Sequence, residues 1–122
     1  MATILVVDDA RIMRMNLGKM LSSLGHEVIG EAENGSDAIE KYKSLKPDVV
    51  TMDITMPEQN GIKDGIDATQ HIKEFDTNAK IIMVTSHGEE EKVMKAIKAG
   101  AKNYILKPIT IEKVKETLEK IL

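Results

Sequence analysis

The sequence predicts an α/β protein built around one parallel sheet, and three observations carry this prediction. Short runs of aliphatic and β-branched residues alternate with segments in which apolar residues recur every three or four positions. The runs Ile4–Val7 and Val49–Met52 are almost wholly apolar, which is typical of strands buried on both faces of a parallel sheet. Both runs stop at carboxylates, Asp8 and Asp53, so the ends of these strands are the first place to look for chemistry.

The first half of the chain is expected to contain three strands and two helices. Gly25 follows the first helical segment, where many helices end on a left-handed residue, and the run after it has the lower apolar content of an edge strand. The predicted elements are a strand at Thr3–Asp8, a helix at Arg11–Leu24 with Ile12, Leu17, Met20, Leu21 and Leu24 available for its inner face, a strand at His26–Glu31, a helix capped by Ser36 with Ala38, Ile39, Tyr42 and Leu45 on one face, and a strand opened by Pro47 and ending at Asp53.

The second half continues the alternation after a loop that contains Pro57 and Gly61. Three glutamates begin one helical segment and Gly100 follows it, and both features suit the ends of a helix. The predicted elements are a helix near Ile66–Phe75, a strand at Lys80–Ser86, a helix at Glu89–Ala99, a strand at Asn103–Lys107 and a helix at Ile111–Leu122 with Val114, Leu118 and Ile121 facing inward.

Five strand–helix pairs joined by right-handed crossovers place helices on both faces of the sheet. We therefore expect a (βα)5, flavodoxin-like, doubly wound five-stranded parallel sheet with strand order 2-1-3-4-5. In that order the first and third strands lie side by side where the strand order reverses, and open α/β sheets bind ligands there, beyond the carboxyl ends of the strands. Asp8, Asp9, Asp53, Thr85 and Lys107 all fall at such ends.

Composition narrows the functional classes. The net charge of −3 and an aromatic content of 2% argue against a nucleic-acid partner, and the absence of cysteine excludes disulfides and cysteine-based zinc sites. The sequence contains neither a signal peptide nor an apolar stretch that would insert into a membrane. We expect a monomeric cytoplasmic protein in which residues 1–122 form a single domain.

The three carboxylates are the strongest functional lead. Asp8, Asp9 and Asp53 would repel one another at one edge of the sheet unless a cation held them. Mg²⁺ prefers oxygen ligands and commonly takes one or two carboxylates, which suits Asp9 and Asp53 as direct ligands. Two structural alternatives stay open: Asp8-Asp9 can end a strand and cap a helix, and Lys107 can be an ordinary solvated lysine.

Four stretches carry a resemblance to a known family: ILVVDDARIMRMNL, VTMDITMPEQNG, MVTS and AGAKNYILKP. In this order and spacing the chain resembles the receiver domain of two-component response regulators, and in particular the single-domain chemotaxis regulators of the CheY type, which lack an output domain. The resemblance implies that Asp53 accepts a phosphoryl group from a sensor histidine kinase. It also implies that Asp8 holds Mg²⁺ through water, that the Thr55 carbonyl completes the metal site, and that Lys107 supplies a second cation.

The resemblance further implies a conformational readout. Thr85 would donate its hydroxyl to the phosphoryl group, and Tyr104 would turn from an exposed to a buried position. The altered surface would then bind a motility motor or a motor-adaptor protein. The chain departs from the family pattern at Lys63–Asp67, where about four extra residues echo a Gly-Ile-x-Asp pattern and predict a longer loop or an added turn.

Other functions compete with this switch. Mg²⁺-dependent aspartyl-phosphate phosphatases combine similar residues, but their nucleophile lies in an Asp-x-Asp pattern after the first strand, whereas this chain has adjacent Asp8 and Asp9 there. A phosphate sink or shuttle in a phosphorelay would use the same site without an output partner. A flavin-binding module lacks support, because acids follow the first strand where such a module needs a phosphate loop. We expect a self-phosphorylating and self-dephosphorylating switch, not an enzyme that turns over an external substrate.

Overall fold

The computed structural model describes all 122 residues as five strands alternating with five helices. The elements are β1 (Thr3–Val7), α1 (Arg11–Ser23), β2 (Glu27–Ala32), α2 (Gly35–Leu45), β3 (Val49–Asp53), α3 (Gly65–Phe75), β4 (Ile81–Thr85), α4 (Glu90–Ala99), β5 (Asn103–Leu106) and α5 (Ile111–Ile121). Each predicted element is present, and most boundaries differ from the predicted ones by one or two residues. No helix is long and apolar enough to cross a membrane.

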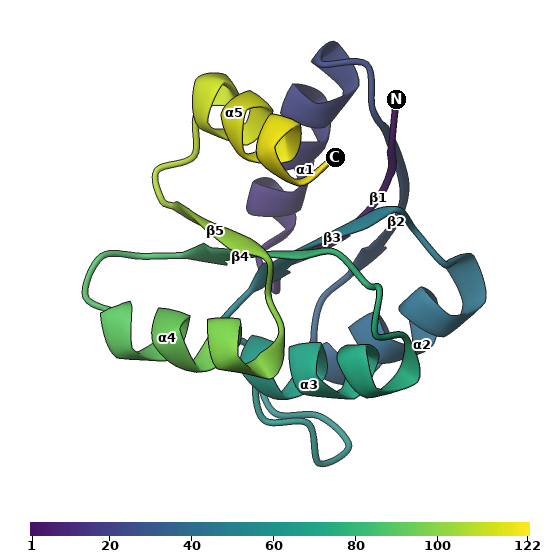
Figure 1. Cartoon of the computed structure of the whole chain (residues 1–122), viewed down its shortest axis with the longest axis vertical. Coiled ribbons are helices and arrows are strands. Elements are labelled where there is room, and N and C mark those ends of the chain that lie inside the picture. The colour runs from purple at the N-terminus through teal and green to yellow at the C-terminus, as the bar shows by residue number, and fades with distance from the viewer.

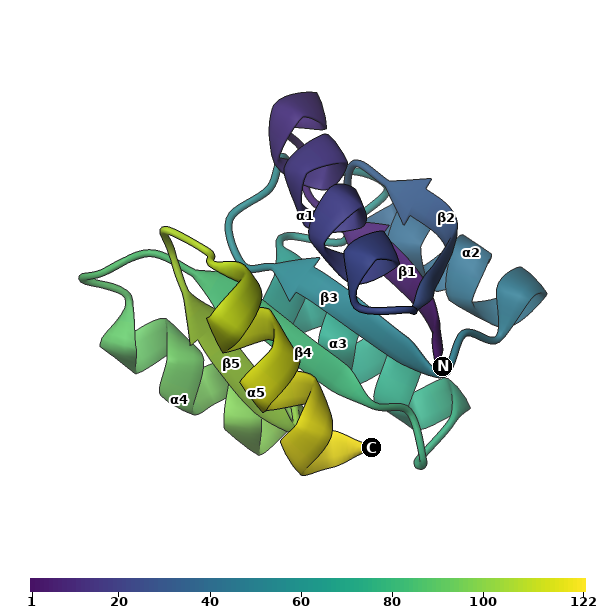
Figure 2. The same ribbon diagram turned by 90° about the horizontal axis from the view of Figure 1, so that it is seen from above.

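The strands form one parallel sheet in the order β2-β1-β3-β4-β5, as predicted. Helices α1 and α5 cover one face of the sheet, and α2, α3 and α4 cover the other (Figure 1; Figure 2 shows α1 and α5 from above). The sheet therefore separates two apolar cores, since successive side chains of a strand point to opposite faces. Leu17, Leu21 and Leu118 belong to the core under α1 and α5, whereas Ala38 and Ile72 belong to the core on the other side.

Two details of the predicted helices are wrong. Asn34, not Ser36, caps α2, because its side chain accepts a hydrogen bond of 2.8 Å from the Asp37 amide. Ile12 lies on the solvent side of α1, with 63% of its surface exposed, and Leu45 is also exposed at the end of α2. A helix-period pattern identifies a face only roughly, so the apolar residues in its first and last turns are the least certain to be buried.

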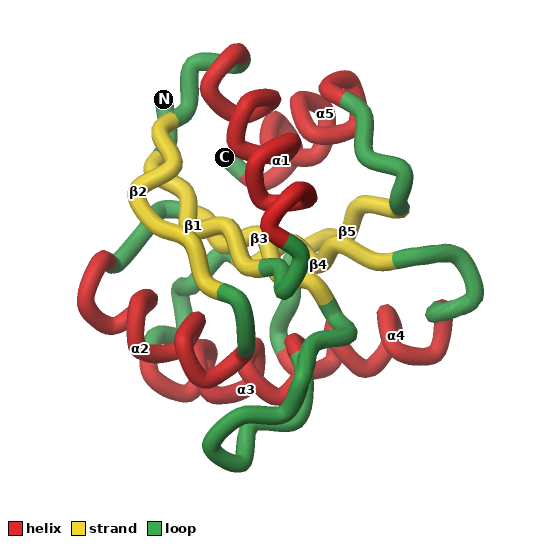
Figure 3. The backbone as a smooth tube through the Cα atoms, turned by 180° about the vertical axis from the view of Figure 1, so that it is seen from behind, coloured by secondary structure: helices red, strands yellow, loops and turns green.

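The extra residues between β3 and α3 form a short hairpin that projects from the molecule (Figure 3). Gln59 and Ile62 exchange backbone hydrogen bonds of 3.1 and 3.0 Å across the turn residues Asn60 and Gly61. Both turn residues have positive φ, 52° and 82°, as a two-residue type I′ turn requires. The added turn therefore precedes Lys63–Asp67, and within that stretch Asp64 caps α3 by accepting a hydrogen bond from the Asp67 amide.

Candidate functional site

Three carboxylates meet beyond the adjacent ends of β1 and β3. Asp8 and Asp9 follow Val7, Asp53 ends β3, and β1 pairs with β3 so that Val7 lies opposite Met52. Carboxylate oxygens of Asp8, Asp9 and Asp53 all lie within 4.8 Å of one another. Asp8 and Asp53 are buried and Asp9 is exposed, so the cluster forms a charged recess that is open on one side.

Two hydrogen bonds hold the loop after β1 in place, and they use only one of the carboxylate oxygens of Asp8 and Asp9. One carboxylate oxygen of Asp8 accepts a 2.8 Å bond from the Ala10 amide, and the Asp8 carbonyl accepts a 2.7 Å bond from the guanidinium of Arg14. Arg14 is held in turn by Glu31 at 2.8 Å. Helix α1 begins after Ala10 without any side-chain cap, so the alternative in which Asp8-Asp9 caps this helix is wrong.

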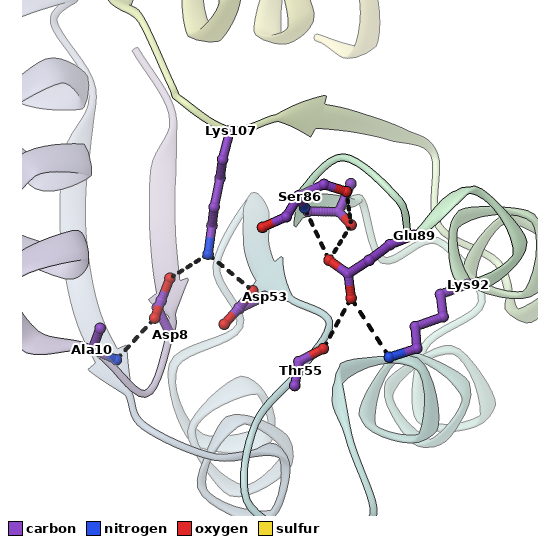
Figure 4. Close-up of polar contacts among 9 residues, drawn as sticks. Asp8, Ala10, Asp53, Thr55, Ser86, Glu89, Lys92 and Lys107 are labelled. Atoms are coloured by element: carbon purple, nitrogen blue, oxygen red, sulfur yellow. Dashed lines mark hydrogen bonds and ion pairs between the residues drawn. The ribbon is translucent and has the colours of Figure 1, made fainter.

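Lys107, just past β5, reaches across the sheet edge into the recess (Figure 4). Its ammonium lies 3.3 Å from a carboxylate oxygen of Asp53 and 3.7 Å from one of Asp8. Its side chain is only 25% exposed, so the alternative of a freely solvated lysine is also wrong. The Lys107–Pro108 peptide is cis.

One ammonium does not balance this many buried acids. Burial, and then repulsion from Asp8, raise the pKa of Asp53 to about 6, although Lys107 acts in the opposite direction. Burial also raises the pKa of Asp8, against the lowering effects of the Ala10 amide and Lys107. The recess is therefore an electrostatically unfavourable arrangement that a further cation would relieve.

Gly65 packs directly beneath Asp53. A Cβ atom at Gly65 would lie 2.0 Å from the Asp53 carbonyl oxygen, and the Gly65 amide donates a 2.8 Å bond to the Ile54 carbonyl. Only a residue without a side chain permits this approach, because real carbon–oxygen contacts are much longer. The start of α3 thus fixes the backbone that carries the Asp53 side chain.

Thr85 ends β4 on the other side of Asp53, and its hydroxyl is already engaged. It donates a 2.9 Å bond to the carboxylate of Glu89, which also accepts from the Ser86 amide at 2.9 Å. The other oxygen of Glu89 accepts a 3.0 Å bond from the Thr55 hydroxyl (Figure 4). These bonds to the Ser86 amide and the two hydroxyls lower the pKa of Glu89, so the carboxylate is charged at neutral pH.

Tyr104 lies in β5 with 43% of its surface exposed. Its ring borders a cavity of about 270 Å³ between β5 and α4 that is also lined by Val93, Ile97 and Glu89. The loop after Thr85 lines the same cavity through Ser86. The arrangement offers room for the ring to move inward.

Comparison with known proteins identifies the family. Residues 4–119 match the response regulator receiver domain. The chain belongs to this family. It is 53% identical to the chemotaxis protein CheY of Thermotoga maritima, over 97% of this chain and 95% of that protein, and 50% identical to CheY of Bacillus subtilis, over 98% and 96%.

A solved structure agrees with the relationship. The CheY in the CheX-CheY-BeF3-Mg²⁺ complex of Borrelia burgdorferi has a TM-score of 0.90 and 36% identity, over 98% of this chain and 87% of that one. The resemblance to a CheY-type chemotaxis response regulator is thereby confirmed, together with the predicted fold. Receiver domains of this type are signalling switches and not substrate-turnover enzymes.

The acidic recess of this receiver domain fits Mg²⁺ by the chemistry of its donors. All the ligand atoms gathered within 4.8 Å are carboxylate oxygens, and no histidine or cysteine competes among them. Asp8, Asp9 and Asp53 would hold the ion. The raised pKa values of Asp8 and Asp53 are the observation that favours a cation at this place.

Sequence reasoning brought together Asp8, Asp9, Asp53, Thr85 and Lys107, and the structure places all five along one edge of the sheet. The roles of Glu89, which the sequence indicates only as part of the acidic start of a helix, and of Arg14 are seen only in the structure. The spacing from Ser86 to Glu89 is that of a capping box and would have indicated a side chain folded back toward β4. No signal in the sequence indicated the bond from Arg14 to the Asp8 carbonyl.

Proposed function

We propose that this receiver domain is a phosphorylation-activated switch that takes a phosphoryl group from a sensor histidine kinase onto Asp53. The observation that carries the proposal is the position of Asp53 between two further acids and the ammonium of Lys107, which lies 3.3 Å away. The names of its relatives support a role for the switch in chemotaxis, and the kinase partner is proposed on the same basis. We propose that it acts in the cytoplasm as a monomer.

The chemistry at Asp53 is an in-line displacement at phosphorus. A carboxylate oxygen of Asp53 forms the new oxygen–phosphorus bond, and the bond from phosphorus to the donor's histidine nitrogen breaks. The electron pair of that bond stays with the imidazole, which takes a proton from solvent. With its pKa raised to about 6, Asp53 is still mainly ionised at neutral pH and able to attack.

Residues of this chain stabilise the charge that develops on the phosphoryl oxygens. Lys107 already reaches Asp53 from β5 and is placed to move from the carboxylate to a phosphoryl oxygen. Mg²⁺, when bound by Asp8, Asp9, Asp53 and the Thr55 carbonyl, would neutralise negative charge on the transferred group. Loss of either cation leaves the acids of the recess opposing the approach of an anionic donor.

The signal would leave the site through Thr85 and Tyr104. A phosphoryl group on Asp53 offers anionic acceptors for the Thr85 hydroxyl, and movement of the loop after β4 would open space for the Tyr104 ring beside α4. The surface formed by α4, β5 and α5 would then change its affinity for a partner. We propose a motility motor or a motor-adaptor protein as that partner.

The test is phosphorylation by a small donor. Incubation with acetyl phosphate and Mg²⁺ should add about 80 Da, the mass of one phosphoryl group, and Asp53→Asn should abolish the adduct. Repeated turnover of a phosphomonoester by the purified protein would instead support a phosphatase. An adduct that leaves the affinity for every motor and adaptor candidate unchanged would support a phosphate sink or shuttle.

A further inference from the structure

The side chain of Glu89 joins the two loops that flank Asp53 (Figure 4). One oxygen accepts bonds from the Thr85 hydroxyl and the Ser86 amide, both at 2.9 Å, on the loop after β4. The other oxygen accepts a 3.0 Å bond from the Thr55 hydroxyl on the loop after β3, and Lys92 lies 3.6 Å from it. A single carboxylate therefore ties the proposed readout residue to the loop that carries the proposed metal ligand.

Helix capping explains only part of this arrangement. Glu89 occupies the N-cap position of α4 but makes no side-chain bond to the amides of its own helix. Its bond to the Ser86 amide has the Ser-x-x-Glu spacing of a capping box, but Ser86 lies three residues before the N-cap and begins no helix. The bonds to Thr85 and Thr55 satisfy no helix terminus, so they need a different explanation.

A hydroxyl has one proton, and this limits what Thr85 can do. While the Thr85 hydroxyl donates to Glu89, it cannot also donate to a phosphoryl oxygen on Asp53. Glu89 and the phosphoryl group are both anions, so they would repel each other if they shared the same donors. The two interactions exclude each other.

We infer that Glu89 is a positioning residue that holds Thr85 in the unphosphorylated arrangement and competes with the phosphoryl group for its hydroxyl. The inference rests on the proposed function of Asp53. Donation from Thr85 to the phosphoryl group then requires that the bond from the Thr85 hydroxyl to Glu89 break. Glu89 thus opposes phosphorylation, and weakening its bonds favours the phosphorylated state.

The experiment measures the initial rate of adduct formation from acetyl phosphate and Mg²⁺ by intact mass. Glu89→Gln keeps the length of the side chain but replaces charge-assisted bonds by weaker neutral ones, and we expect a gain of about fivefold over wild type. Glu91→Gln removes the same charge from the first turn of α4, where Glu91 is exposed, and we expect no comparable gain.

A second pair of variants separates the bond to Thr85 from simple removal of a negative charge. In a Thr85→Val background, which keeps the side-chain shape and removes the hydroxyl, Glu89→Gln should no longer increase the rate. A gain that persists without the hydroxyl overturns the inference, as does a rate for Glu89→Gln equal to or below that of Glu91→Gln. An adduct absent from the wild-type protein overturns the proposed function of Asp53, and the inference with it.

Discussion

Asp53→Asn should make the metal-free protein more stable at neutral pH, although it removes the residue on which the function depends. Burial and Asp8 raise the pKa of Asp53 from 3.8 to about 6, so the folded protein binds this proton more tightly than the unfolded chain does. Above pH 6 the native state carries the full cost of the buried charge. A shift of about two pKa units corresponds to ~3 kcal/mol, which is the upper estimate for the gain in unfolding free energy at pH 7.5.

The difference in unfolding free energy between Asp53→Asn and the wild type depends on pH. As the pH falls through 6 toward 4, Asp53 binds its proton in the folded protein first, and the wild type recovers the stability that the variant already has. The advantage of Asp53→Asn should therefore shrink to about 1 kcal/mol by pH 4.5. Urea unfolding followed by circular dichroism in EDTA at both pH values measures the difference.

Mg²⁺ should reduce the stability advantage of the variant. A ligand that binds only the folded state at 100 times its Kd adds about 2.7 kcal/mol, and the variant has lost one carboxylate ligand. We therefore expect saturating Mg²⁺ at pH 7.5 to stabilise the wild type more than Asp53→Asn. Glu91→Gln, an exposed carboxylate outside the recess, should show neither effect. Equal stability of wild type and Asp53→Asn in EDTA at pH 7.5 would refute the electrostatic reasoning.

Three further substitutions test the packing around the site. Gly65→Ala places a Cβ 2.0 Å from the Asp53 carbonyl oxygen, so it should lower the unfolding free energy by ~2 kcal/mol and slow adduct formation. Gly18→Ala, whose Cβ would have its nearest neighbour at 4.0 Å, should not destabilise the protein. Equal unfolding free energies for the two variants would contradict the contact. Lys107→Met should lower the metal-free unfolding free energy at pH 7.5 by ~2 kcal/mol in urea titrations, because two buried acids lose their cation, and an unchanged value would show that the ion pairs contribute nothing. Thr51→Val should raise the unfolding free energy by ~1 kcal/mol, since the Thr51 hydroxyl is buried without a partner, and a loss would indicate a bound water in its place.

The positions of the strands and their order in the sheet were the features best predicted from the sequence, because each follows from a single physical rule. Apolar runs bounded by turn residues located all five strands, and the strand order 2-1-3-4-5 expected of a doubly wound sheet makes β1 and β3 neighbours. Once these strands are adjacent, residues at their carboxyl ends must lie together, so Asp8 and Asp53 could be paired before any coordinates were known. The same logic placed Lys107 at the edge of the recess.

The details that escaped prediction depend on choices among near neighbours. Asn34 and Ser36 are both good helix caps, and only the backbone shows that Asn34 is the one at the N-cap position. The hairpin at Asn60 was expected only as a longer loop or added turn. Glu89 begins a helix by sequence, yet its side chain bonds to Thr55, which is far away along the chain. Side-chain bonds between distant loops leave no periodic pattern.

The central claim is that Asp53 is the phosphoryl acceptor of a Mg²⁺-dependent switch. The most direct measurement is peptide mass spectrometry after incubation with acetyl phosphate, with Mg²⁺ and with EDTA. The account predicts a gain of about 80 Da that maps to Asp53, depends on Mg²⁺ and is absent from Asp53→Asn. A phosphoryl group on any other residue, or an adduct unchanged in Asp53→Asn, would contradict it.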